Sequence, residues 1–415
     1  MQVEVINTGT ELLLGSVLNT HLRFLAQELF PLGLRVTRQV TVPDGPDIRN
    51  ALLESFARAG VVIVTGGLGP TSDDITREVT AELLGLELVH DEAIMAAITA
   101  RFVRRGLTTG PRVGRQAERP REAVVLPNEN GTAPGLYFAP RPRVGEDPGA
   151  LTPHIFLLPG PPRELHPMFR ASVLPILKSV APASDFGIRT WRIAGLGESH
   201  VEEKVGERLL ALGVELGYCA RPGEVDLRVI GSPEALQAAE SIVVGALEPN
   251  IVSPEARSLE SVVVELLAGA GATVATAESC TGGFLAHRIT NVPGASAVFH
   301  AGFVTYANEA KERDLAVDGQ LIADNGAVSA QVAAAMAEGA RTRASATYGV
   351  ATTGIAGPGG GSAGKPVGTV YIALAKAGAV PRVEHRCFPT ERETFKDLAT
   401  QTALDLIRRE LRGLP

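Results

Sequence analysis

The 415-residue chain is expected to form an α/β protein with three domains, and three observations predict this. In its first and last parts, apolar strands alternate with helices, the pattern of a parallel sheet covered by helices on both faces. Several of these strands run directly into glycine-rich loops, as at 61–70. A short middle part instead predicts the order β-α-β-β-α, a two-layer α+β module. We therefore expect domains at residues 1–170, 171–250 and 251–415.

The first domain opens with an alternating strand at 3–6, and the most apolar strand of the domain lies at 61–64. Further strands are expected at 34–42 and 155–158, and helices at 19–32, at 46–58 and from about residue 74 onward. The segment 139–153 is rich in Pro and Gly and predicts a surface hairpin.

In the middle module we expect strands at 191–194, 214–219 and 225–230, with helices at 199–212 and 233–247. Residues 250–258 contain Pro and Ser with little apolar content and are interpreted as a linker. The last domain is predicted to begin with a helix, followed by strands at 273–277, 298–305, 348–353 and 368–375. A long helix over 390–412 closes the chain.

Charge and cysteine usage exclude several classes of protein. The 39 Lys and Arg residues are outnumbered by 46 Asp and Glu, and no helix carries a basic stripe, so nucleic acid is not expected as the main partner. Three distant cysteines argue against a thiolate zinc site and a disulfide framework. With no signal-peptide pattern or membrane span, the prediction is a cytoplasmic protein.

Two loops of the first domain, 9–15 and 65–74, follow strands and contain five glycines between them. Ligands of open parallel sheets bind at the carboxyl ends of strands, where glycine lets the backbone approach an anion. Asp73 and Asp74 are placed to hold a divalent cation against a diphosphate. The alternative is a tight turn in which Asp caps a helix.

The sharpest feature of the last domain is Ser279, which lies at a predicted strand-to-helix turn. A hydroxyl there can act as a nucleophile close to helix N–H groups, although a helix N-cap is the alternative. The three histidines of this domain lie in no triad-like setting, so Lys311 is the candidate base, the alternative being an exposed helix cation. Only six of the 39 cations are lysines, which favours a special role for some of them.

A second glycine-rich loop, 353–361, could wrap a phosphate or ribose through its N–H groups, or be a flexible hairpin. Arg392 begins the last helix, where the helix dipole does not favour a cation. Its position suits a bound anion, and a solvated side chain is the alternative.

Residues 2–170 resemble the molybdopterin-binding (MoaB/MogA-like) domain, through the runs 8–12, 65–71, 73–76, 126–128, 131–135 and 158–162. The runs 131–135 and 158–162, together with the downstream domain, resemble the competence/damage-inducible protein family CinA closely and over essentially the whole chain. In that family this domain is similar to a metal-dependent ADP-ribose pyrophosphatase. The resemblance implies metal ligands Asp73 and Asp74, and substrate contacts at Glu11, Asn19, Asp44, Gly66, Gly67, Gly69 and Thr71.

Runs 276–283, 302–311, 326–329, 354–358 and 365–370 resemble the C-terminal CinA domain, which is similar to bacterial nicotinamide mononucleotide (NMN) deamidase. That enzyme class implies a Ser/Lys amidohydrolase with Ser279 as the nucleophile and Lys311 as its base. Tyr306 would position or tune them. The implied substrate contacts are Thr281, Gly282, Gly283, Thr353, Gly354, Gly357 and Arg392.

The resemblance thus implies a bifunctional hydrolase of pyridine-nucleotide turnover, with NMN and ADP-ribose as substrates. We expect a divalent metal such as Mg²⁺ for the first domain, no cofactor for the deamidase, and a homodimer. The middle module resembles a KH-like fold in outline only and lacks a basic G-x-x-G loop, which favours a spacer or dimerisation role. Alternatives are a protein that binds or processes molybdopterin, and a non-enzymatic accessory to DNA uptake or recombination.

Overall fold

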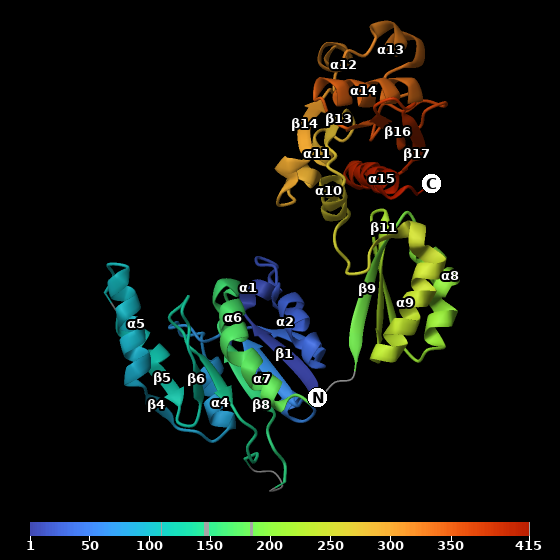
Figure 1. Ribbon diagram of the computed structural model, residues 1–415. Helices are drawn as coiled ribbons and strands as arrows, with labels where there is room; N and C mark the ends of the chain where they lie inside the picture. The colour runs from blue at the N-terminus through green and yellow to red at the C-terminus, as the bar shows by residue number, and fades with distance from the viewer. Residues whose placement is uncertain (109, 145–148, 183–185, 415) are drawn as a thin grey trace. The chain divides into compact units, whose positions relative to one another are not determined.

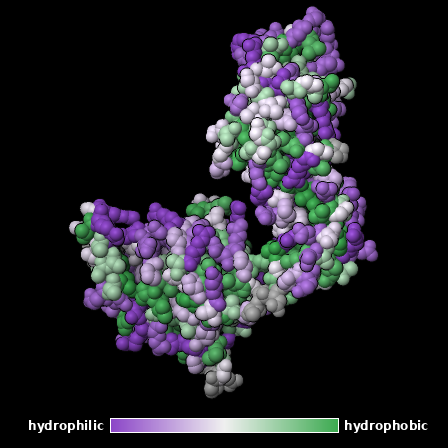
Figure 2. All heavy atoms as spheres, viewed as in Figure 1, coloured by the Kyte–Doolittle hydropathy of each residue, from purple (hydrophilic) through white to green (hydrophobic). Residues whose placement is uncertain are grey.

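The computed structural model describes residues 1–108, 110–144, 149–182 and 186–414. The chain divides into two compact units, Met1–Asp185 and Phe186–Pro415, the second of which contains both the middle module and the last domain (Figure 1). Hydrophilic side chains are spread over the visible face of each unit (Figure 2). Within the described ranges, no helix has the length and apolar character needed to cross a membrane.

A six-stranded mixed sheet forms the centre of the first unit, in the order β2-β1-β3-β8-β7-β6. Four neighbouring strands are parallel, as predicted: β2 (Arg35–Val42), β1 (Gln2–Thr8), β3 (Val61–Thr65) and β8 (His154–Leu158). The antiparallel strands β7 (Gly135–Phe138) and β6 (Val124–Leu126) extend the sheet, and neither was predicted from the sequence. Both strands are too short for their alternation to stand out.

Helices cover both faces of this sheet because the central strands are apolar on both sides. Val3 and Val5 pack with α2 (His21–Leu29), η3 (Phe169–Val173) and α7 (Leu174–Val180), whereas Ile6 packs with α3 (Asp47–Phe56). The remaining elements are α1 (Thr10–Leu13), η1 (Phe30–Leu32), α4 (Thr76–Leu83), β4 (Leu88–His90), α5 (Glu92–Arg104), η2 (Pro111–Ala117), β5 (Glu118–Pro120) and α6 (Pro162–Met168). Of the predicted hairpin at 139–153, residues 145–148 lie outside the described part, and Pro142 pairs with Leu151 in an antiparallel bridge.

The middle module is a four-stranded antiparallel sheet in the order β10-β11-β9-β12, packed against α8 (Glu198–Leu210) and α9 (Pro233–Leu247). Its strands are β9 (Gly187–Ala194), β10 (Glu215–Arg221), β11 (Glu224–Gly231) and β12 (Ile251–Ser253). The prediction that 250–258 is only a linker was wrong, because β12 lies within it and pairs with β9. Strand β12 has only three residues, all of them buried, and these are too few to show the alternation of apolar and polar residues that marks a strand.

The last domain has a five-stranded sheet in the order β14-β13-β15-β16-β17. Strands β14 (Phe299–Val304), β13 (Val274–Glu278) and β15 (Tyr348–Gly354) are parallel, and β16 (Thr369–Lys376) and β17 (Arg382–Cys387) are antiparallel. Side chains of α14 (Ala330–Arg343) pack on one face, and those of α10 (Leu259–Gly269), α11 (Phe284–Thr290) and α15 (Arg392–Arg412) pack on the other. The shorter elements are η4 (Glu248–Asn250), η5 (Ala295–Ala297), α12 (Asn308–Leu315) and α13 (Gly319–Asn325).

Candidate active sites

Ser279 lies directly after β13, at the carboxyl end of a parallel strand. All five residues of β13 are buried, and the Ser279 backbone N–H donates to the Thr352 carbonyl at 3.0 Å. The chain then turns through Gly282 and Gly283, both with positive φ, into α11. The N-cap of α11 is Gly283, so the alternative that Ser279 is a plain helix cap is wrong.

Lys311 approaches Ser279 from α12. Its side chain is 1% exposed, and its Nζ lies 3.3 Å from the Ser279 Oγ. The same Nζ donates to the Thr305 carbonyl at 2.7 Å, which fixes its position. Burial lowers the pKa of Lys311 because the buried site disfavours the cation. The alternative of an exposed helix cation is therefore wrong. A lysine whose pKa is lowered and whose amine lies next to a hydroxyl has the geometry that a general base needs.

A buried carboxylate, Glu278, supports the turn, and it was not predicted as a site residue. The side chain is fully buried and accepts hydrogen bonds from the N–H groups of Gly283, Leu285 and Ala286 at 2.8 to 3.0 Å. It also accepts from the Thr281 Oγ1 at 2.7 Å. Glu278 thus satisfies donors that α11 would leave unpaired at its positive end. A glutamate ending an apolar strand just before a helix is the signal that could have identified it.

A pocket of about 230 Å³ brings together most of the predicted residues of this domain. One predicted residue in the wall, Arg392, donates to the Tyr306 Oη at 2.9 Å and to the Gly357 carbonyl at 2.8 Å. Another, Thr353, donates from its Oγ1 to the Ala327 carbonyl at 2.7 Å. The predicted residues lining the pocket are Ser279, Tyr306, Lys311, Thr353, Gly354 and Arg392.

Other predicted contacts lie beside this pocket rather than in its wall. Thr281, Gly282 and Gly283 line a neighbouring hollow with Lys396. The Thr281 hydroxyl is buried between Glu278 and Thr352, so it serves the turn. Gly357 contributes the carbonyl that Arg392 binds. Whether these residues contact a substrate stays a prediction.

Residues in or beside the pocket that were not predicted include Cys280 and Lys365. Cys280 lines it, but burial raises the pKa of this thiol to about 12, so it stays protonated at neutral pH and is a poor nucleophile. Lys365 lies outside the wall and donates from its Nζ to the carbonyls of Asn325 at 2.9 Å and Val328 at 2.6 Å. It thereby holds the loop that supplies Ala327 and Val328 to the pocket.

In the first unit, a separate pocket of about 370 Å³ lies at the carboxyl ends of the parallel strands. Among the residues of its wall that were not predicted as site residues are Glu164, at the start of α6, and Gln116. The predicted residues that line it are Glu11, Asp44, Gly66, Gly67, Gly69, Asp73 and Asp74.

Two predicted contacts of this domain have local roles instead. The Asn19 Nδ2 donates to the Asn7 Oδ1 at 2.6 Å, and Asn19 is absent from the pocket wall. The Thr71 N–H donates to the Asp74 Oδ2 at 2.9 Å, which orders the loop. Asp44 accepts from the Thr10 N–H at 3.0 Å while also lining the pocket.

The charge of this pocket bears on the predicted metal. Five carboxylates line it, none of its described lining residues is Lys or Arg, and Asp73 and Asp74 are both among them. Gly69 makes room for Asp74, because a Cβ there would lie 2.4 Å from the Asp74 Oδ2. In the described part of the chain, no group of three or more His, Cys, Asp or Glu side chains is close enough to form a complete metal site. A divalent cation at this pocket would therefore take only some of its ligands from the protein, and the metal stays a prediction.

The fold and the two pockets define a class: an α/β protein that joins an acidic strand-end pocket to a separate domain with a buried serine–lysine pair. A CinA-like protein from Akkermansia muciniphila is 47% identical over 408 residues, which cover 97% of this chain and 96% of the relative. A CinA-like protein from Gloeobacter violaceus is 41% identical and covers 98% and 96% of the two chains. The chain belongs to the CinA family.

Each part also matches a domain family. Residues 4–179 match the "Probable molybdopterin binding domain", residues 188–248 the "Damage-inducible protein CinA KH domain", and residues 256–411 the "CinA C-terminal domain". Among solved structures, the competence/damage inducible protein CihA from Agrobacterium tumefaciens is 41% identical. It covers 37% of this chain and 93% of its own, with a TM-score of 0.36.

Proposed function

We propose that the last domain hydrolyses the carboxamide of NMN to nicotinate mononucleotide and ammonia. The observation that carries this proposal is the buried amine of Lys311, 3.3 Å from the Ser279 hydroxyl, in a pocket that also contains Arg392. A neutral lysine can accept the serine proton, whereas an arginine could not.

In the proposed reaction, the Ser279 Oγ attacks the carboxamide carbon while the Lys311 Nζ takes the hydroxyl proton. The resulting ammonium returns this proton to the departing amide nitrogen, so that ammonia leaves and an ester to Ser279 remains. Water then attacks the ester, again giving its proton to Lys311, and the acid and free serine are released. The sequence of steps balances without any cofactor.

Arg392 supports a nucleotide as the substrate. It lines the pocket, and its hydrogen bonds to Tyr306 and to the Gly357 carbonyl direct the guanidinium toward the glycine-rich loop. A guanidinium held in this way pairs well with a phosphate. We propose that it binds the 5′-phosphate of NMN.

For the first unit we propose metal-dependent cleavage of ADP-ribose to AMP and ribose 5-phosphate. A pocket with five carboxylates and no described basic residue in its wall repels a diphosphate unless cations neutralise it. When bound, a divalent cation supplies that neutralisation and polarises the phosphoryl oxygens. Asp73 and Asp74 would hold it, next to the glycines at 66, 67 and 69 that also line the pocket.

Ammonia release from NMN tests the first assignment, with wild type and Ser279→Ala compared at equal concentration. Ser241→Ala, an exposed serine on α9, is the matched control. We expect ammonia from wild type and the control but not from Ser279→Ala. Equal release from all three would show that Ser279 is not the nucleophile.

Cleavage of ADP-ribose tests the second assignment. We expect AMP to form with added Mg²⁺, to disappear with EDTA, and to fall strongly in Asp74→Asn. If molybdopterin but not ADP-ribose protected this unit against heat, a cofactor-binding role would replace the hydrolase. Salt-dependent binding of DNA would favour the non-enzymatic alternative.

A further inference from the structure

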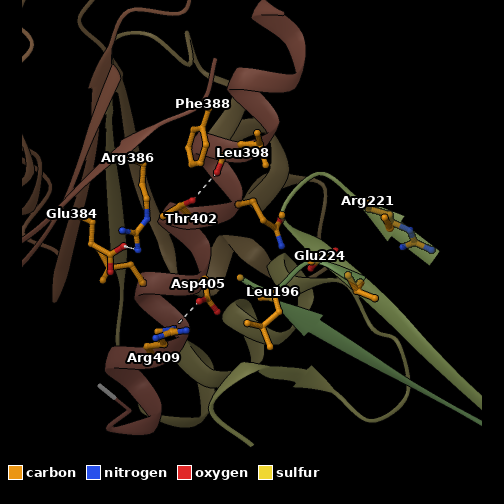
Figure 3. A pocket seen from close by; sticks show the side chains of 18 residues that line it. Leu196, Arg221, Glu224, Glu384, Arg386, Phe388, Leu398, Thr402, Asp405 and Arg409 are labelled. Atoms are coloured by element: carbon orange, nitrogen blue, oxygen red, sulfur yellow. Dashed lines mark hydrogen bonds and ion pairs between the residues drawn. The ribbon is translucent and has the colours of Figure 1, made fainter. Parts of the chain in front are cut away.

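The middle module is packed directly onto the last domain, with which it shares a hydrophobic core. Ala194 of β9 and Val252 of β12 are 1% and 0% exposed, and they belong to the same apolar cluster as Leu259 and Ile407 of the last domain. Beside this core, a cavity of about 460 Å³ lies between the β10–β11 hairpin of the module and β17 and α15 of the last domain (Figure 3). The two parts therefore form one folded unit.

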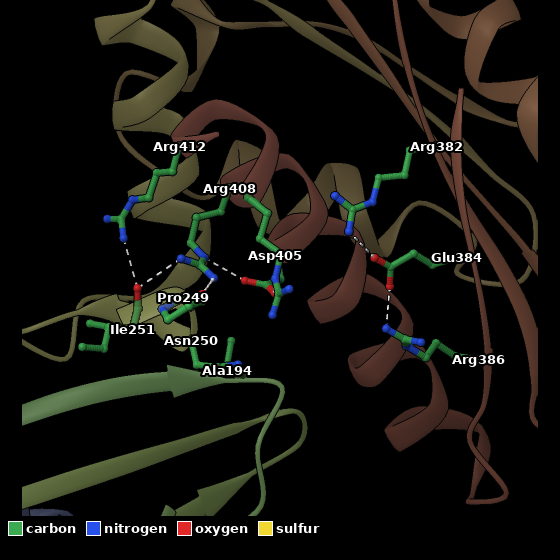
Figure 4. Close-up of polar contacts among 11 residues, drawn as sticks. Ala194, Pro249, Asn250, Ile251, Arg382, Glu384, Arg386, Asp405, Arg408 and Arg412 are labelled. Carbon is green, nitrogen blue, oxygen red and sulfur yellow. Dashed lines mark hydrogen bonds and ion pairs between the residues drawn. The ribbon is translucent and has the colours of Figure 1, made fainter. Parts of the chain in front are cut away.

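Buried arginines of α15 add polar contacts to this junction. Arg408 is fully buried, and it donates to the carbonyls of Ile251 at 3.1 Å and Pro249 at 2.8 Å (Figure 4). Arg412 also donates to the Ile251 carbonyl, at 3.0 Å. Because a buried guanidinium is costly to leave unpaired, these hydrogen bonds fix the C-terminal part of α15 on the module.

The β10–β11 hairpin reaches α15 at a second place, the side chain of Gln401. Gly223 lies at the turn of the hairpin with φ +75°, and a Cβ there would lie only 2.9 Å from the Gln401 Cγ, so the close approach requires glycine. The next residue, Glu224, is 8% exposed. Burial raises the pKa of Glu224, whereas Arg192, a hydrogen bond from Gln401 and the charge of Arg288 act to lower it. A carboxylate of the module is thus bound by a side chain of α15.

Arg288 of α11 binds the other side of the Gln401 amide. Its Nη2 donates to the Gln401 Oε1 at 2.6 Å and to the Glu260 Oε2 of α10 at 3.0 Å. Its Nη1 donates to the Thr400 Oγ1 at 3.0 Å, and the side chain is 15% exposed. One guanidinium therefore joins α11 to α10 and α15 and, through Gln401, to Glu224 of the module.

Helix α11 continues directly from the turn that presents Ser279. It has seven residues, and isolated helices shorter than about 12–15 residues are marginal in water, so α11 depends on its contacts. Glu278 accepts hydrogen bonds from N–H groups at its N-terminal end, and Arg288 holds its last turn. Arg288 does not line the Ser279 pocket. Movement of α11 would nevertheless displace the turn, and a misplacement of about 1 Å can slow a reaction about 100-fold.

We propose that Arg288 is a positioning residue for Ser279, and that the middle module acts on it through Glu224 and Gln401. The module then has a part in the reaction of the last domain, beyond the role of a spacer or a dimerisation element. The inference rests on the proposed deamidase function, because the turn that is positioned carries the nucleophile of that reaction.

Hydrogen exchange of the full chain tests the positioning without any substrate. We expect the amides of Leu285 and Ala286 to exchange about tenfold faster in Arg288→Met, and also faster in the module variant Glu224→Met, because each change removes a charge-assisted hydrogen bond. Glu224→Gln keeps an acceptor for the Gln401 amide and should restore most of the protection. The amides of α14, on the other face of the sheet, should be unchanged and report that the domain is folded.

Ammonia release from NMN is the second readout. Arg288→Met should lower kcat about tenfold and Glu224→Met by a smaller factor, with KM within about twofold of wild type, since neither residue lines the pocket. The double variant should be no slower than Arg288→Met, because both changes break the same connection. The matched control is Arg341→Met, which removes an arginine of α14 that is 20% exposed and paired with Glu338. It should behave as wild type in both measurements.

Unchanged exchange at Leu285 and Ala286 in both single variants would overturn the inference, whether or not NMN is the substrate. Effects in Arg288→Met alone, with Glu224→Met like wild type, would overturn the role of the module. If exchange changed as expected but wild type released no ammonia, the deamidase assignment would fail while the positioning of α11 by the module would stand.

Discussion

The amine of Lys311 lies 3.3 Å from the hydroxyl of Ser279, although 32 positions separate the two residues along the chain. The lysine is held by the Thr305 carbonyl and sealed from water, while the serine is presented by a turn at the end of a buried strand. Burial and proximity together are what the proposed roles of nucleophile and base require.

The first prediction concerns the pH dependence of the deamidase. Burial lowers the pKa of Lys311, and the amine is active as a base only when neutral. Ammonia release should therefore rise with pH and level off above this lowered pKa, below the value of about 10.4 for an exposed lysine. A pH–rate profile measures this, and a rate that falls over this range would contradict the role of base.

The variant Lys311→Arg should lose about 100-fold or more in ammonia release, because a guanidinium cannot take the serine proton. Its residual rate should lack the rising limb seen in wild type. The exposed Lys204 of α8 provides the control Lys204→Arg, which should retain the wild-type profile. Activity retained in Lys311→Arg would show that a group other than Lys311 is the base.

The same pKa shift affects stability. The folded state disfavours the cationic form of Lys311, so the unfolded state binds more protons between the lowered pKa and about 10.4. The contribution of Lys311 to the unfolding free energy should thus increase as the pH rises through this interval. Denaturant unfolding of wild type and Lys311→Met at several pH values measures it, and the increase should be absent in the variant.

The second prediction concerns Arg392 and the phosphate. Arg392→Ala should raise KM for NMN about 10- to 100-fold, the range expected for the loss of charge-assisted hydrogen bonds. The corresponding nucleoside, nicotinamide riboside, lacks the phosphate and should be processed equally by wild type and variant. Equal losses for both compounds would show that Arg392 serves the pocket only through Tyr306 and Gly357.

The third prediction concerns Lys365, whose two hydrogen bonds hold the loop at 325–328. Lys365→Met should lower kcat for ammonia release about tenfold, because the pocket wall near Thr353 loses its support. The pH at which the profile levels off should not change, since Lys365 does not touch the reacting groups. A shifted profile would instead point to a direct electrostatic effect on Lys311.

The fourth prediction concerns Glu278. Glu278→Gln replaces one buried acceptor with an amide donor and leaves N–H groups of α11 unpaired, at a cost of about 3 kcal/mol. For a domain of this size, the thermal midpoint should fall roughly 6–12 °C. Glu203→Gln, at an exposed site on α8, is the control and should leave the midpoint unchanged. An unchanged midpoint in Glu278→Gln would show that the carboxylate does not stabilise the turn.

Much of the fold was accessible from the sequence because long apolar strands and helices carry strong periodic signals. The parallel strands β1, β3 and β13 were predicted, and so was the placement of Ser279 at a strand end. Strands β6, β7 and β12 were missed because each has three or four residues and depends on pairing with a distant neighbour. Helix α5 and strand β17 were not predicted either.

The residues of the candidate sites also fall into those that the sequence predicts and those whose role only the structure shows. A glycine-rich turn between a strand and a helix is a local feature, so it can be recognised along the chain together with the Ser, Thr or Asp that it carries. The burial of a side chain, by contrast, depends on which distant segments of the chain pack against it. Only the three-dimensional packing shows that Lys311 is sealed beside Ser279 while Asn19 turns toward Asn7.

Local order in this chain therefore follows from residue periodicity and turn chemistry, which act over a few positions. The lowered pKa of Lys311 and the acidic character of the first pocket both arise from contacts between distant segments. Solvent exclusion and the electric field at a site are sums over neighbours in space, and the folded structure alone decides which neighbours those are.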